Sequence, residues 1–77
     1  MNKTIYETAM VWFTDHEARR EFAKKVISED YEITNIPSTN LVSVQKMPAD
    51  TLYSWLNARG IDYVAENYPW GISIEQQ

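Results

Sequence analysis

The chain has 77 residues, with seven basic against eleven acidic side chains and a formal net charge of −4 at pH 7. Its hydrophobic content of 44% is typical of a folded globular protein and not of a disordered chain. The sequence contains no cysteine, which excludes disulfides and thiol chemistry. The negative charge disfavours electrostatic binding to nucleic acid or to an anionic membrane.

The N-terminal segment does not resemble a signal peptide, because Glu7 and Thr8 interrupt its apolar residues. No apolar stretch approaches the ~20 residues that a membrane-spanning helix requires. We therefore expect a cytoplasmic protein in which residues 1–77 form a single domain.

Residues 4–13 are rich in β-branched and aromatic types, which favour a strand. Strict alternation places Tyr6, Met10 and Trp12 on one face of this strand and residues such as Val11 on the other. Because both faces are largely apolar, the segment is typical of a central strand.

The segment TDHE, Thr14–Glu17, predicts the start of a helix over residues 15–28. The Thr14 hydroxyl can cap the helix while the Glu17 side chain reaches back to the Thr14 amide, which forms a capping box. The chain's one histidine, His16, falls within this start. A catalytic histidine needs a partner that orients it, and this position favours an exposed, structural side chain instead.

The same helix carries most of the basic charge of the chain. Four basic residues recur on it and are expected to face outward: Arg19, Arg20, Lys24 and Lys25. From Ile61 to the C-terminus there are three acidic residues and no basic one. The charge is therefore divided between a basic helix and an acidic C-terminal part.

Two further strands are predicted over residues 31–37 and 41–47. The short loop Ser38–Asn40 makes them an antiparallel hairpin, in which Asn40 suits a left-handed backbone position.

Pro48 then begins a second helix, where its missing amide costs nothing, and Gly60 ends it. A strand is predicted over residues 61–66. Residues 67–77 follow either as a C-terminal tail or as an extra edge strand.

The order β-α-β-β-α-β predicts an α+β fold of the ferredoxin-like split β-α-β type. The usual handedness of the crossovers predicts one antiparallel sheet with both helices on one face. The opposite face then exposes aromatic and apolar side chains, which usually mark an interaction surface. The expected partner-binding residues lie on this face and on the basic helix: Tyr6, Met10, Trp12, Leu41, Met47, Arg19, Arg20 and Lys24. In an alternative interpretation, the tail residues 68–72 fold over this face and bury it.

Most enzyme chemistries lack their residues in this sequence. No serine lies in a recognisable nucleophile turn, and one histidine without cysteine does not form a metal site. The two glycines, Gly60 and Gly71, are explained by turns and do not form a phosphate-binding loop. We expect no catalytic activity, no metal and no cofactor.

These observations predict a non-enzymatic protein–protein interaction module that binds another protein or itself. By analogy with small phage proteins that block host factors, it would act as a stoichiometric inhibitor or adaptor. One alternative is a dimeric ferredoxin-like domain that senses a small ligand. A third interpretation, single-stranded RNA binding, is disfavoured because residues 41–47 lack the aromatic and glycine residues of RNA-recognition domains and because the net charge is negative.

Overall fold

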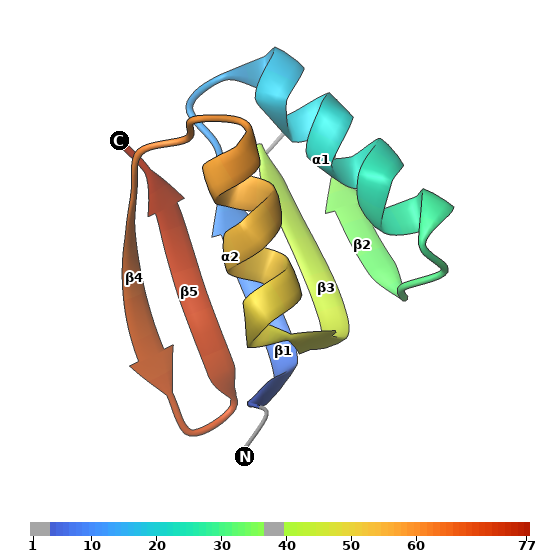
Figure 1. Ribbon diagram of the computed structural model, residues 1–77, viewed down its shortest axis with the longest axis vertical. Helices are drawn as coiled ribbons and strands as arrows, with labels where there is room; N and C mark the ends of the chain where they lie inside the picture. The colour runs from blue at the N-terminus through green and yellow to red at the C-terminus, as the bar shows by residue number, and fades with distance from the viewer. Residues whose placement is uncertain (1–3, 37–39) are drawn as a thin grey trace.

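The computed structural model describes residues 4–36 and 40–77 of the chain. Within these residues, five strands form one mixed sheet in the order β2-β3-β1-β5-β4, and two helices lie on the same face of it (Figure 1). In chain order the elements are β1 (Ile5–Trp12), α1 (His16–Ser28), β2 (Ile33–Ile36), β3 (Leu41–Pro48), α2 (Ala49–Ala58), β4 (Tyr63–Tyr68) and β5 (Gly71–Gln76).

The predicted α+β class is confirmed, but the predicted antiparallel sheet is not what the structure has. β1 pairs antiparallel with β3 and parallel with β5. The split β-α-β prediction places the strand after the second helix next to β1. Here β5 occupies that position, and β4 lies outside β5 (Figure 1). Residues 67 and 68 therefore complete the edge strand β4, and residues 71–76 form the interior strand β5 instead of an extra edge strand or a tail folded over the sheet.

The core lies between the sheet and the two helices. Its largest fully buried side chains are Phe22, Met47, Leu52, Leu56, Ile72, Ile74, Val11, Val26, Val42 and Val44. Burial of one side chain of this size contributes about 1.5–3 kcal/mol. Because the sequence has no cysteine and hence no disulfide, this packing is the main source of stability.

Along β1 and β3, side chains alternate between the core and the opposite face of the sheet, and this alternation shifts by one residue at Glu7 and Lys46. Counting back from the buried Ala9, strict alternation would bury Glu7, yet Glu7 and Lys46 are both exposed. The opposed residues Tyr6 and Met47 are buried instead, at 9% and 0% exposure. Lys46 has φ 54°, a left-handed conformation that rotates the strand. The prediction that Tyr6 and Met47 lie on the exposed face is therefore wrong.

The start of α1 also differs from the predicted capping box. Asp15 is the N-cap, and its Oδ1 accepts a hydrogen bond of 3.0 Å from the Glu17 amide. The Thr14 amide donates to Oε1 of Gln76 at 2.9 Å, so the Glu17 side chain is not needed there. Gln76 accepts from the Asp15 amide as well, and it thereby ties the start of α1 to the end of β5.

The predicted left-handed position of Asn40 is confirmed by its φ of 56°. The rest of the predicted loop, Ser38 and Thr39, lies outside the described residues, as does Pro37 at the end of the predicted strand.

Candidate interaction surface

The strand register shows which side chains lie on the face of the sheet opposite the helices, which we call the open face. Its first row across the sheet is Leu41, Trp12, Glu75 and Val64. The second row is Thr34, Ser43, Met10, Ser73 and Glu66. The third row is Gln45, Thr8, Gly71 and Tyr68. A hydrogen bond of 3.2 Å from Thr8 Oγ1 to Gln45 Oε1 shows that neighbouring side chains of the third row share this face.

Large apolar side chains are exposed along the first row. Trp12 is 37% exposed in the central strand, and Val64 is 55% exposed in β4. Leu41 beside Trp12 and Met10 in the next row are each partly buried. At the end of the central strand β1, the open face thus presents a tryptophan beside smaller apolar and polar side chains.

An aromatic pair at the β4–β5 turn extends the open face. Tyr68 and Trp70 stack almost parallel, with ring centroids 4.9 Å apart and 6° between the ring planes. Both side chains are about two-fifths exposed, at 41% and 42%. A hydrogen bond between Tyr68 and Glu66 raises the pKa of the Tyr68 hydroxyl above its ordinary value. The pair presents a flat aromatic surface with a carboxylate beside it.

The charged residues in the rows of the open face are the acids Glu66 and Glu75. The basic residues in the described part of the chain lie outside these rows: on α1, at Lys46, and at Arg59 after α2. These three rows are therefore acidic and apolar, whereas Glu7 and Lys46 are exposed just beyond them and α1 exposes Arg20, Lys24 and Lys25. A binding partner with basic residues would complement the open face.

The residues predicted to bind a partner fall in two places on the sheet. Three of them lie on the open face: Met10, Trp12 and Leu41. The other two, Tyr6 and Met47, lie in the core on the helix side of the sheet. The Tyr6 hydroxyl is 3.4 Å from the hydroxyl of Tyr53 in α2, which places its ring beneath that helix.

Of the basic residues predicted on α1, Arg20 and Lys24 are exposed but Arg19 is only 3% exposed. The prediction that Arg19 faces outward is wrong, because Arg19 lies at helical spacing from Phe22 and Ala23 on the buried side of α1.

Arg19 instead holds the neighbouring histidine. Its Nη2 lies 3.1 Å from Nε2 of His16, and His16 Nδ1 lies 3.4 Å from Oδ1 of Asn40. A guanidinium only donates, so Nε2 accepts and Nδ1 carries the proton toward Asn40. His16 is exposed, as predicted, and links α1 to the residue before β3.

Sequence reasoning missed the part of the open face that β4 and β5 supply: Val64, Glu66, Tyr68, Trp70 and Glu75. The available signal was Pro69-Trp70, which form a two-residue turn between Tyr68 and Gly71. Instead, the strand was predicted to end at Glu66, and residues 67–77 were expected as a tail or an extra edge strand.

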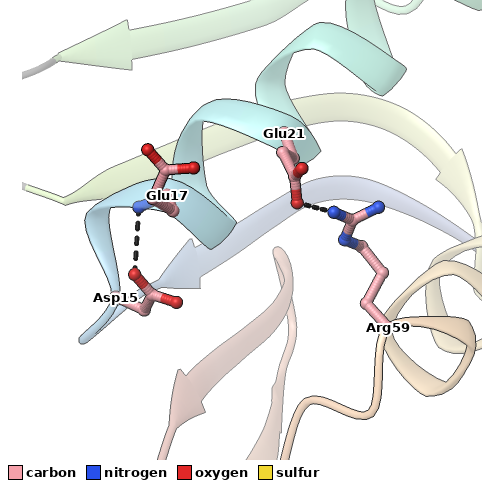
Figure 2. Close-up of polar contacts among 4 residues, drawn as sticks. All are labelled: Asp15, Glu17, Glu21 and Arg59. Atoms are coloured by element: carbon pink, nitrogen blue, oxygen red, sulfur yellow. Dashed lines mark hydrogen bonds and ion pairs between the residues drawn. The ribbon is translucent and has the colours of Figure 1, made fainter.

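A polar region lies between the start of α1 and the end of α2 (Figure 2). Asp15 caps the Glu17 amide, and Glu21 forms an ion pair with Arg59 that joins the two helices. The paired side chains are 44% and 49% exposed, so the pair contributes at most about 1 kcal/mol. Within residues 4–36 and 40–77, no group of three His, Asp or Glu side chains is placed to hold a metal ion. These charges have structural partners, and the open face is the stronger candidate.

No protein-family model matches the chain, and neither the curated proteins nor the solved structures contain a significant match. Of the helices in the described part of the chain, neither has the length and apolar character to cross a membrane. The functional interpretation therefore rests on the geometry of the open face.

Proposed function

We propose that this protein is a non-enzymatic interaction module that binds another protein through its open face, as a stoichiometric inhibitor or adaptor does. The observation that carries the proposal is the exposure of Trp12 in a central strand, on the face opposite both helices. Tryptophan and tyrosine dominate the energetic centres of protein interfaces. The same face also exposes Val64 and Tyr68, and exposed apolar side chains gathered on one face are typical of a binding site.

The charge of the open face defines the partner's chemistry. Glu66 and Glu75 border the apolar residues in adjacent rows. A partner surface that is apolar at its centre and basic at its rim fits this arrangement. Rim charges act mainly on the rate of association and are screened by salt, so binding should weaken as ionic strength rises.

We also propose that the fold is a ferredoxin-like unit modified by the insertion of β5 between β1 and β4. The order β2-β3-β1 and the two helices on one face support this relationship. The inserted strand contributes Glu75 to the open face and moves Val64 one strand further out, which widens the surface offered to a partner.

Site-directed photo-crosslinking in lysate of the native host tests the proposal. A photo-reactive phenylalanine replaces Met10 on the open face in one variant and Arg20 on the outer side of α1 in the control. We expect one dominant protein to be captured from position 10 and not from position 20. Trp12→Ala in the first variant should abolish the capture, while circular dichroism shows that the fold is kept.

Two outcomes would contradict the proposal. Equal capture from positions 10 and 20, or capture that Trp12→Ala leaves unchanged, would show that the open face is not the binding site. Saturable thermal stabilisation by a small metabolite, without any captured protein, would favour the ligand-sensor alternative.

A further inference from the structure

The outer edge of the sheet at β4 is open to strand addition. β4 is the last strand in the sheet order and pairs with β5 over all six of its residues. Edge strands of natural proteins are usually protected by charged side chains, above all lysine, by proline, by a bulge or by short length, and β4 carries one charged side chain, Glu66. The sequence YVAENY contains neither proline nor lysine, and its register with β5 is uninterrupted. The other edge strand, β2, has four residues and packs against α1.

The hydrogen-bonding direction of β4 follows from one contact beside it. The Gln77 amide, directly after β5, donates to the Asp62 carbonyl at 2.8 Å, so the backbone carbonyl of Asp62 is directed toward the β5 side. In an antiparallel strand the N–H and C=O of one residue point to the same side, and successive residues alternate. The backbone groups of Val64, Glu66 and Tyr68 therefore point toward β5. The backbone N–H and C=O groups of the remaining β4 residues point outward, away from β5: Tyr63, Ala65 and Asn67.

We propose that β4 pairs antiparallel with β4 of a second copy of this chain, around a two-fold axis at Ala65. This inference concerns the sheet edge and does not depend on the proposed function of the open face. In this register Ala65 lies opposite Ala65 of the second copy, and Tyr63 lies opposite Asn67. Each outward-directed N–H and C=O of β4 then has a partner. A two-fold interface of this kind is self-complementary, as a closed dimer requires.

Side-chain chemistry supports this register over its neighbours. On the open face, Val64 falls opposite Glu66 of the second copy, so no like charges are opposed. A register centred on Asn67 would oppose Ala65 to Pro69, which lacks an N–H. A register centred on Tyr63 would leave the outward groups of Asn67 without a partner.

The approach to the edge on the helix side is not blocked by Tyr63. Its ring stacks on Tyr53 of α2, with centroids 6.0 Å apart, and is thereby held against the helix. At the proposed axis Ala65 has a small, exposed side chain. Pairing would produce one continuous sheet across two copies and place their open faces side by side. Because a single strand pair buries less than the roughly 1,600 Å² of a standard interface, we expect reversible association that depends on concentration.

Amide hydrogen exchange on the wild-type chain tests this pairing directly. The amides of Val64 and Glu66 should be protected at all concentrations, because they bond to β5. The amides of Tyr63, Ala65 and Asn67 should exchange about tenfold more slowly when the concentration is raised into the dimeric range. Sedimentation velocity over the same concentrations should show a shift from monomer to dimer.

Ala65→Pro removes an outward N–H without removing a bond to β5, so it should leave the chain folded and monomeric. Ala65→Val keeps that N–H and serves as the matched control that still dimerises. A monomer at every concentration would overturn the proposal, as would a dimer whose outward amides stay unprotected. If Ala65→Pro fails to fold, the concentration dependence of amide exchange in the wild-type chain alone decides whether β4 pairs with a second copy.

Discussion

Gly71 lies against the backbone of Thr8 so closely that a Cβ on Gly71 would collide with the Thr8 carbonyl. The two residues are register partners in the parallel pairing of β1 and β5. Gly71 has φ 148°, a conformation that side-chain-bearing residues rarely adopt. The absence of a side chain here is what allows β5 to begin next to β1.

Gly71→Ala should therefore lower the free energy of unfolding by at least about 2 kcal/mol, from backbone strain and the collision with Thr8. Gly60→Ala is the matched control, because Gly60 has φ 66° but open space around its α-carbon. Its left-handed backbone alone should cost about 1–2 kcal/mol. Urea unfolding of both variants measures the difference, and a smaller loss for Gly71→Ala would refute the close approach.

The one-residue shift of the side-chain alternation at Lys46 can be tested by replacing two methionines, Met47 and Met10, with alanine in separate variants. Met47 is fully buried in the core, whereas Met10 lies on the open face. Met47→Ala should cost about 2–5 kcal/mol and Met10→Ala less than about 1 kcal/mol in chemical denaturation. Peroxide should likewise oxidise Met10 before Met47, as mass spectrometry would show. Equal stability losses would mean that strict alternation holds through Glu7.

The helix cap makes a third paired comparison. Asp15→Ala should destabilise the protein by about 1 kcal/mol, because its carboxylate caps the Glu17 amide. Thr14→Ala should change the free energy of unfolding by at most about 0.5 kcal/mol, because the Thr14 backbone amide keeps its bond to Gln76. Thermal and urea unfolding distinguish the two variants. A larger stability loss for Thr14→Ala than for Asp15→Ala would instead support the capping box centred on Thr14.

Alkaline pH should reveal the partly buried Tyr53 of α2. Burial, together with the hydrogen bond to Tyr6, raises the pKa of Tyr53 from 10.0 to about 12. The folded state thus holds this proton more tightly than the unfolded state does. Its contribution to stability is complete below pH 10 and is lost as the pH rises from 10 toward 12.

The ultraviolet absorbance of tyrosinate measures this titration, and unfolding at several pH values measures its effect on stability. Tyr53→Phe should remove the step at the highest pH and weaken the loss of stability in that range. If Tyr53→Phe leaves both curves unchanged, the raised pKa does not belong to Tyr53.

Local signals in the sequence were enough to define the helices. The helix predicted over residues 15–28 is observed as His16–Ser28, and α2 lies between Pro48 and Gly60 as expected. Capping residues, proline and glycine act within a few residues of the backbone they control, so they can be recognised without the rest of the fold.

The place of β5 in the sheet could not be predicted in this way. Ile72 and Ile74 alternate with Ser73, a pattern that fits an edge strand as well as an interior one. Tertiary packing decides which strand β5 pairs with. The one local requirement of this pairing is a glycine at position 71, because the backbone of Thr8 in β1 leaves no room for a side chain there.

The composition of the candidate site was only partly predictable for a related reason. Strict alternation identified Met10 and Trp12 on the open face but misplaced Tyr6 and Met47. The cause is one left-handed residue, Lys46, and lysine is not a residue type that signals positive φ. Arg19 was misplaced because arginine is rarely buried, even at helical spacing from core residues.

The pairing of β1 with β5 has a consequence for how the chain folds. These two central strands are separated by most of the sequence, so the middle of the sheet is closed by contacts of high contact order. Such topologies fold more slowly than helical bundles because a long loop must close before its contacts are gained. During synthesis, β1 emerges long before β5, and its edge stays unpaired until the last strand has been translated. We therefore expect the nascent chain to rely on chaperones more than its small size suggests.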